Sequence, residues 1–260
     1  MYAKPTSTSR LYTLRRTGLT SALGIMTVLV VAACAADVPS GPHALAPQTS
    51  SFNRATRLEE AATLGSASKF AVLGASTVTC TGAGTNTGDV GVSPGSSITG
   101  FNPDCTLTGA IHSADDAAAS AQGDAATAYG NLSAKPCDRT FGTVQELSGI
   151  TLTPGVYCFP SSAQISGGDL TLSGPGTFIF KVSSTFITST GSAVVLSGGA
   201  NCGNIYWLVG SSSTLGGPVS GNIIAYTSIG FNPGATLAGR AIALNAAVTM
   251  SGQNSVTPCR

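Results

Sequence analysis

Apolar positions in the second half of the chain recur in a short phrase, in which an apolar residue is followed one or two places later by Gly. The five copies are Leu172-Ser173-Gly174, Leu196-Ser197-Gly198, Leu215-Gly216-Gly217, Leu237-Ala238-Gly239 and Met250-Ser251-Gly252. Their apolar residues lie 24, 19, 22 and 13 residues apart, and the residue before each is Thr or Val. This recurrence predicts a β-solenoid with about one coil per repeat. The short last step is either another face of the same coil or a truncated terminal coil.

Strand alternation predicts which of these residues face solvent. If Leu172, Leu215, Leu237 and Met250 point into the solenoid, the Thr before each points outward, and the same parity extends to neighbouring strands. The candidate surface residues are Thr171, Ile187, Ser189, Thr214, Ser228, Thr236, Ala247 and Thr249. Ile187 and the neighbouring Gly230 interrupt any column of Thr that these residues form.

One segment has the pattern of a helix. Ser113 is predicted as the N-cap, acidic residues follow in the first turn, and Gly130-Asn131 is predicted to end the helix after Tyr129. A helical stripe suited to packing against the solenoid consists of Ala117, Ala121, Ala125 and Ala128 with Tyr129. We therefore expect the helix to cover one face of the solenoid.

Charged residues make up only 9% of the 260 residues, against 42% hydrophobic residues and 33 Gly. From residue 170 onward the charged side chains are Lys181, Arg240 and Arg260. Nucleic-acid binding is not expected, because it depends on clustered Lys and Arg. The sharpest change in composition lies near residue 63, which favours a single folded domain after it.

The N-terminus has the order of an export signal, with Lys4, Arg10, Arg15 and Arg16 before an apolar run over 19–33. Val31-Ala32-Ala33-Cys34 resembles a bacterial lipobox, in which the Cys is lipidated. Ordinary cleavage near Ala33 to Ala36 is the alternative. We expect a lipoprotein-type signal peptide over 1–33, lipidation at Cys34 and a Pro-rich flexible tether over 34–62. The protein is then an exported outer-membrane or cell-surface lipoprotein, or alternatively a secreted protein.

Six cysteines follow Cys34, and an even number in an exported chain favours disulfides. Six cysteines allow 15 pairings. The predicted pairs are Cys80–Cys105, Cys137–Cys158 and Cys202–Cys259. The first two close loops of about one coil and the third holds the C-terminus. A metal site is the rival reading, but the chain has no CxxC and its histidines, His43 and His112, lie elsewhere.

Several segments together resemble the ice-binding protein family of polar bacteria, fungi and algae. The resemblance runs from about residue 63 to residue 260. Its motifs include Leu64-Gly65-Ser66-Ala67-Ser68-Lys69-Phe70-Ala71-Val72-Leu73, Gly88-Asp89-Val90-Gly91-Val92-Ser93-Pro94-Gly95, Leu152-Thr153-Pro154-Gly155-Val156-Tyr157, Asn204-Ile205-Tyr206-Trp207 and Gly239-Arg240-Ala241-Ile242-Ala243-Leu244. It implies a mostly β fold, a right-handed discontinuous β-solenoid of triangular cross-section with one long α-helix packed alongside. It also implies adsorption to ice. Many family members have Thr-Ala-Val-Thr near the last coil, where this chain has Ala246-Ala247-Val248-Thr249.

The surface chemistry fits this implied activity. A flat, uncharged solenoid face can present Thr hydroxyls and methyls at a regular spacing, without charged groups that hold competing hydration. An envelope adhesin or structural module on the same scaffold is the alternative. Catalysis is not expected, because the acids are scattered and His112 lies at the helix entrance, where a capping or surface role is favoured. We expect a monomer that binds an ice surface and, through its lipid, a membrane, with no metal or cofactor.

Overall fold

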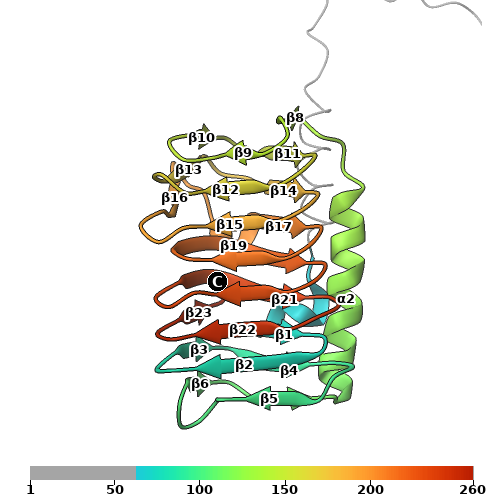
Figure 1. The fold of residues 1–260 in the computed structure, drawn as a ribbon. Coiled ribbons are helices and arrows are strands. Elements are labelled where there is room, and N and C mark those ends of the chain that lie inside the picture. Colours follow the sequence, from blue (N-terminus) through green and yellow to red (C-terminus); the bar gives the residue numbers. More distant parts are fainter. Residues whose placement is uncertain (1–62, 260) are drawn as a thin grey trace, which may run out of the picture. The chain divides into compact units, whose positions relative to one another are not determined.

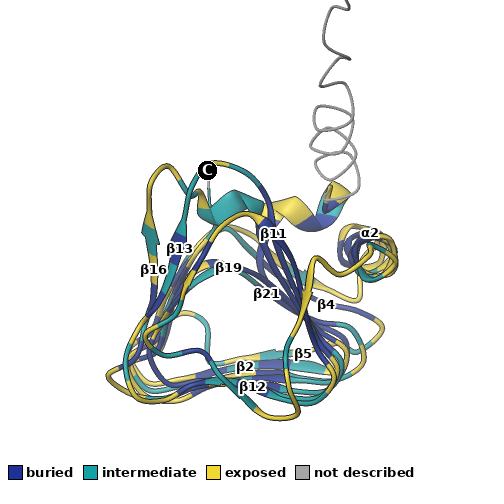
Figure 2. Ribbon diagram, turned by 90° about the horizontal axis from the view of Figure 1, so that it is seen from above, coloured by how far each residue is buried: buried dark blue, intermediate teal, exposed yellow. Residues whose placement is uncertain are grey.

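The computed structural model describes residues 63–259, which belong to the larger of two compact units, Pro47–Arg260. These residues form parallel β-strands wound into coils of triangular cross-section, with one α-helix, α2 (Asp116–Ser133), alongside (Figures 1 and 2). The expected mostly β solenoid with a helix packed against it is therefore confirmed. We name the three sides of the coil face A, face B and face C.

Face B is one continuous sheet of eight parallel strands. In spatial order it consists of β5 (Ser97–Thr99), β2 (Thr77–Thr81), β22 (Val248–Ser251), β20 (Ile229–Phe231), β18 (Ser213–Leu215), β15 (Phe186–Thr188), β12 (Ala163–Ile165) and β9 (Gln145–Glu146).

Face A lies under the helix and consists of nine strand segments. They are β7 (Ile111–Ser113), β4 (Asp89–Val92), β1 (Phe70–Gly74), the second halves of β21 (Thr236–Ala243) and β19 (Pro218–Ala225), β17 (Ile205–Val209), β14 (Phe178–Val182), β11 (Gly155–Phe159) and β8 (Arg139–Thr140). Two 3₁₀ turns, η1 (Gly65–Lys69) and η2 (Cys202–Asn204), precede β1 and β17.

Face C has two parts. A five-strand part consists of β6 (Thr106–Thr108), β3 (Thr85–Thr87), β23 (Ser255–Thr257) and the first halves of β21 and β19. A separate three-stranded sheet on the same side consists of β10 (Thr151–Leu152), β13 (Leu170–Ser173) and β16 (Val194–Ser197) (Figure 2).

Strands β19 and β21 bend from face C to face A, and glycine makes the bend possible. Gly221 and Gly239 are paired across the two strands and have φ of 116° and 153°. A Cβ on Gly239 would lie 1.9 Å from the carbonyl oxygen of Gly221, so a side chain cannot fit there. The two strands therefore join faces A and C into one twelve-stranded sheet.

The order of coils along the solenoid differs from their order in the chain. The described part of the chain begins near the middle of the solenoid, winds to one end through β7, crosses to the other end along α2, and then winds back (Figure 1). Its last coil docks on its first, because β21 pairs with β1, β22 with β2 and β23 with β3. This is the discontinuity that the family resemblance implies.

The copies of the recurrent phrase do not all lie on the same face of the solenoid. Leu172 and Leu196 pair on face C, whereas Leu215 and Met250 lie on face B and Leu237 lies on face C. The short step from Leu237 to Met250 is thus a step between faces of one coil. Away from the pairing of the first coil with the last, paired residues lie from 16 residues apart, as in Ser213 and Ile229, to 27 apart, as in Phe186 and Ser213. The coils are therefore irregular in length, as the unequal spacing of the phrase indicates, because turns of different lengths separate the strands.

The interior of the coil is mostly apolar and aromatic. The rings of Phe180 and Phe186 stack on Trp207 at centroid distances of 3.9 and 4.2 Å, and all three side chains are fully buried. Trp207 Nε1 donates to the carbonyl of Ser220, so its one polar atom is satisfied. The predicted inward residues Leu172, Leu215, Leu237 and Met250 are all buried, which confirms the predicted strand parity.

The helix covers face A through a row of small residues. Ala118, Ala121, Ala125, Ala128 and Leu132 are buried, and a second apolar cluster packs them against face A. The predicted stripe was right at Ala121, Ala125 and Ala128 and wrong at Ala117, which is exposed.

The ends of the helix differ from the prediction. Asp115, not Ser113, is the N-cap, and its carboxylate accepts from Ala118 N at 2.8 Å. Ser113 instead belongs to β7 and donates to the carbonyl of Ser96. The helix continues past Gly130 to Ser133, because Leu132 still packs on face A.

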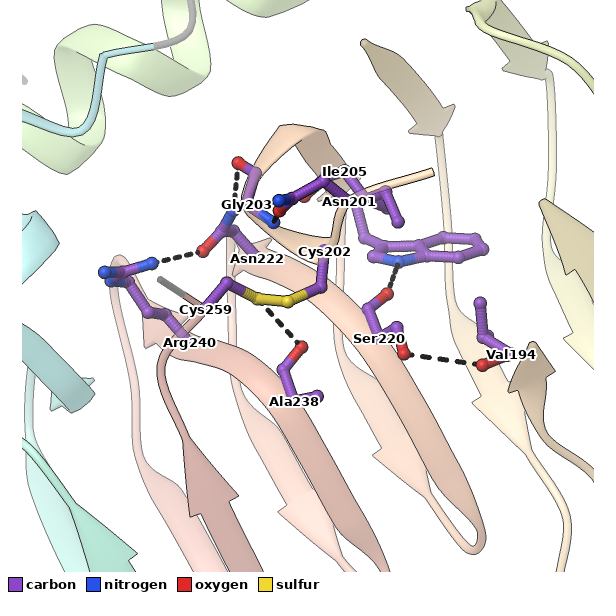
Figure 3. Close-up of a disulfide and its surroundings, with 11 residues drawn as sticks. Val194, Asn201, Cys202, Gly203, Ile205, Ser220, Asn222, Ala238, Arg240 and Cys259 are labelled. Carbon is purple, nitrogen blue, oxygen red and sulfur yellow. Dashed lines mark hydrogen bonds between the residues drawn. A yellow bond between two sulfur atoms is a disulfide. The ribbon is translucent and has the colours of Figure 1, made fainter. Parts of the chain in front are cut away.

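Residues 63–259 contain three disulfides, and they are the predicted pairs Cys80–Cys105, Cys137–Cys158 and Cys202–Cys259. The third links η2 to the residues after β23 (Figure 3). Beside it, Arg240 Nη1 donates to Asn222 Oδ1 at 3.0 Å, and Asn222 Nδ2 donates to the carbonyl of Gly203 at 3.2 Å (Figure 3). Arg240 Nε also donates to the carbonyl of Ser68, so this group ties the N-terminal segment to the C-terminal coils.

Candidate functional site

The three faces of the coil differ in what their outward side chains contact. On face A most outward residues are apolar and lie under the helix, as Ile179, Leu208, Ile224 and Ile242 show, and Lys181, which pairs with Leu208, is a charged exception. Faces B and C carry no helix (Figure 2). Face B is the longer uninterrupted sheet of the two, so we take it as the candidate site.

A single column of outward residues runs the length of face B. Strand register places one residue of each strand beside the next, in the order Thr99, Thr79, Thr249, Gly230, Thr214, Ile187, Gln164 and Glu146. Neighbours in such a column lie about 4.7–4.9 Å apart, because that is the spacing of paired strands. Four of the first five positions in this column are Thr.

A second column of hydroxyl residues flanks the first. Ser228 Oγ donates to Ser212 Oγ at 2.9 Å, and the hydroxyls of Ser162 and Thr185 lie 2.8 Å apart. Ala247 adjoins Ser228 in this column, since Ile229 N donates to the carbonyl of Ala247. The two columns lie about 6.6 Å apart along the strands, which is two residues of strand rise.

The end of face B formed by β9 and β12 has a different chemistry. The carboxylate of Glu146 accepts from the backbone N and Oγ of Ser148 at 2.9 and 2.6 Å, from both groups of Ser166, and from Gln164 Nε2. Partial burial raises the pKa of Glu146, but the hydrogen bonds from Ser148 and Ser166 outweigh this effect and bring the pKa to about 2. The group is therefore ionised at neutral pH and fully engaged within the protein.

The eight candidate surface residues do not form one surface. Six lie on or beside the strands of face B, namely Ile187, Ser189, Thr214, Ser228, Ala247 and Thr249. Thr171 and Thr236 lie on face C, and in different parts of it, since Thr171 is on β13 and Thr236 is on β21. The candidate residues therefore do not share one face, because the phrase occurs on two faces.

Sequence reasoning did not include the N-terminal strands of face B among the candidate surface residues. Thr77, Thr79 and Thr81 alternate with buried Val78 and Cys80 in β2. That period-2 pattern is readable in the sequence. What places these residues beside Thr249 is the docking of the first coil on the last, which no local pattern encodes.

The remaining candidate chemistry has structural roles. His112 Nδ1 lies 2.7 Å from Asp115 Oδ2, and His112 Nε2 lies 3.7 Å from Asp89 Oδ2, so His112 sits at the helix entrance as expected. Within residues 63–259, no three His, Cys, Asp or Glu side chains are grouped as they would be around a metal ion. No helix among these residues has the length and apolar character needed to cross a membrane. Cys34, His43, the predicted signal peptide over 1–33 and the tether over 34–62 lie outside the described residues.

Comparison with known proteins decides the family. A model of the Ice-binding-like family matches residues 72–257. The chain belongs to this family. An ice-binding protein of Nostoc sp. (strain HG1) is 43% identical over 217 residues, which are 81% of this chain and 79% of the relative. One of Flavobacterium frigoris (strain PS1) is 32% identical, with 81% of each chain covered.

Solved structures of the ice-binding family show the same architecture. The structure of an ice-binding protein from an Antarctic biological consortium is 44% identical and superposes with a TM-score of 0.72, covering 76% of this chain and 91% of that chain. That of an Antarctic ascomycete, Antarctomyces psychrotrophicus, is 34% identical with a TM-score of 0.71, covering 76% and 98%. The resemblance read from the sequence motifs and the solenoid fold it implied are both confirmed.

Proposed function

We propose that this ice-binding family protein adsorbs to ice crystals through face B and thereby inhibits ice growth or recrystallisation. The observation that carries the proposal is the register of face B, which aligns outward hydroxyl residues of successive coils in columns. No finding supports the alternative of an adhesin or structural module without ice activity.

Thr is suited to contact with ice because it offers two groups at once. Its hydroxyl can hydrogen-bond an ordered water, and its methyl can rest against the apolar parts of an ordered water layer. Thr249 and Thr99 are exposed, and Thr79 and Thr214 are partly exposed, so these side chains are accessible to a flat crystal surface.

Rigidity of face B lowers the cost of adsorption. The residues that alternate with the outward column, such as Val78, Val248, Phe231 and Leu215, are buried in the core. The outward side chains are therefore already held in place, and little conformational entropy is lost on binding.

Charge is nearly absent from the outward positions of face B. Glu146 is the one ionisable side chain among the outward positions of the eight strands, and its carboxylate is held by Ser148, Ser166 and Gln164. A face without free charges does not hold a competing hydration shell. The activity proposed here is adsorption, with no covalent chemistry, metal or cofactor.

Anchoring at the cell surface is the second part of the proposal. The basic and apolar order of residues 1–33 and the lipobox-like residues before Cys34 support export and lipidation. The three disulfides of the body support an oxidising compartment. The mature protein is then a monomeric lipoprotein of the outer membrane or cell surface. If the signal peptide is cleaved without lipidation of Cys34, it is instead a secreted protein. Mass spectrometry of the mature N-terminus tests this part, and a mature chain without acyl groups on Cys34 would refute lipidation.

Thermal hysteresis and ice recrystallisation inhibition test the ice-binding part. Thr249→Tyr places a bulky ring within the Thr-rich end of face B, and we expect it to reduce both activities by preventing close contact with ice. Ala126→Tyr is the matched control, because Ala126 is exposed on the helix, which covers face A and not face B. A wild-type protein that leaves ice growth unchanged at high concentration would refute the proposed function.

A further inference from the structure

The five-strand part of face C repeats the surface chemistry of face B. Register aligns two outward columns, which we call array C. The first column is Thr106, Thr85, Ser255, Thr236 and Pro218, and the second is Thr108, Thr87, Thr257, Ala238 and Ser220. Eight of these ten residues carry a hydroxyl, and none is ionisable. Array C therefore equals the Thr-rich end of face B in the density of hydroxyls.

The hydroxyls of array C are available to water. Seven of its ten residues are exposed and the other three are partly exposed. Within array C, the one hydroxyl with an internal hydrogen bond is Ser220 Oγ, which lies 3.4 Å from the carbonyl oxygen of Val194. The hydroxyls of Thr85, Thr87, Thr106 and Thr108 thus have no competing partner among the described residues.

Array C rests on a rigid support. The residues that alternate with it point inward, and Val256, Leu237 and Val219 among them are almost completely buried. The central strand, β23, pairs on both sides, with β21 and with β3. The Cys202–Cys259 disulfide holds the chain two residues beyond its end (Figure 3).

General strand preference explains Thr in a sheet but not the absence of charge. Thr is enriched in strands because its branched side chain fits a pleated surface. An exposed surface of a soluble domain normally also carries Lys, Glu, Arg and Asp. Array C has none across five strands, whereas face A, in the same twelve-stranded sheet, has Lys181 among its outward residues.

We propose that array C is a second ice-binding surface, separate from face B. This inference rests on the proposed function, because it assigns the same ligand, a crystal surface of ordered water, to a second site. Faces B and C are two sides of one triangular coil, so they cannot lie on one flat ice plane together (Figure 2). Each face adsorbs by itself, and the protein binds ice in two orientations.

Tyr substitutions on each face, singly and together, test the proposal. Thr85→Tyr blocks array C, Thr249→Tyr blocks face B, and Ala126→Tyr on the helix is the control for a surface Tyr. Thr85→Val is a second variant that removes only the hydroxyl, in case Tyr disturbs the fold, and circular dichroism checks that every variant is folded. The readouts are thermal hysteresis and the set of ice planes on a single-crystal hemisphere that fluorescently labelled protein covers.

We expect each single Tyr variant to lose part of the activity and some of the labelled planes, with different planes lost in the two cases. We expect the double variant to lose ice binding, Thr85→Val to weaken labelling of the planes that Thr85→Tyr loses, and the control to match wild type. If Thr85→Tyr matches wild type and Thr249→Tyr is inactive, array C is refuted and the proposed function through face B stands. If Thr249→Tyr matches wild type and Thr85→Tyr is inactive, face B is refuted instead. An inactive wild type refutes both.

Discussion

Removal of the Cys202–Cys259 disulfide should release the last strand of the solenoid. β23 pairs at three positions with β21 and at two with β3, and it joins the C-terminal coils to the N-terminal ones on face C. The disulfide spans 57 residues of sequence. Loop entropy alone then contributes about 4 kcal/mol to the free energy of unfolding, because an open chain has more freedom to lose on folding. We expect the double variant Cys202→Ser/Cys259→Ser to lose about that much stability.

The structure also predicts which strand is most affected by the loss of stability. β23 is short and ends at Thr257, so without the disulfide its pairing depends on five backbone partners and the burial of Val256. Hydrogen exchange measured by mass spectrometry should show faster exchange in 255–257 than in neighbouring β21, because a short terminal strand opens locally.

Cys137→Ser/Cys158→Ser is the matched control for this prediction. Its disulfide spans 21 residues and contributes about 3 kcal/mol by the same loop entropy, but it lies beside β8 and β11, away from β23. Denaturant unfolding should show a similar loss of stability in both variants, with faster local exchange in 255–257 only in the first. If hydrogen exchange of these residues is unchanged after removal of Cys202–Cys259, the disulfide does not hold β23 in the sheet and the prediction is refuted.

Three further changes test the helix and the end of face B. Ala125→Leu should destabilise the fold by about 1–3 kcal/mol in thermal unfolding, because Ala125 is fully buried against face A, whereas Ala126→Leu on the exposed side should not. Asp115→Ala should lower helix stability by removing the N-cap acceptor, and an unchanged melting temperature would contradict that role. The pKa of Glu146 is lowered from 4.5 to about 2, so its contribution to the free energy of unfolding is present above pH 4.5 and is lost as the pH falls toward 2. The Glu146→Gln variant should be less stable at pH 7, and its stability should depend less on pH between these values.

Local patterns in the sequence predict most of the secondary structure and the parity of the strands. Alternation identifies Thr249 as outward and Met250 as inward because a strand reverses its side chains at every residue. Two of the disulfide pairs were also predictable, since a loop of about one coil brings its two ends close together, and the third was predicted because it holds the C-terminus. The helix was predictable from its Ala-rich stripe, but its N-cap was not. Ala114 adopts a positive φ of 51° that separates Ser113 from the helix, and this turn left no signal in the sequence.

The assignment of strands to faces could not be read from the sequence. Coils of 16 to 27 residues contain turns of unequal length, so equal phrases fall on different sides. Thr171 and Thr236 were grouped with Thr249 for this reason, although they lie on face C. Placing Thr79 beside Thr249 requires knowing that the first coil adds to the edge of the last. That pairing is set by the complementarity of two whole coils and not by either strand alone.

The docking of the first coil on the last links folding to the proposed activity. Thr81 Oγ1 donates to the carbonyl of Met250, 169 residues further along the chain, at the seam between β2 and β22. Thr99 and Thr79 lie on one side of this seam, and Thr249 and Thr214 lie on the other. The Thr-rich end of face B is therefore incomplete until the C-terminal coil has folded and docked. Contacts of such large sequence separation form slowly, because the entropy of closing the chain is lost before they stabilise the fold. Ice binding should consequently appear late in refolding, after the burial of Trp207 within the C-terminal coils, and ice binding that returns together with Trp207 fluorescence would contradict this order.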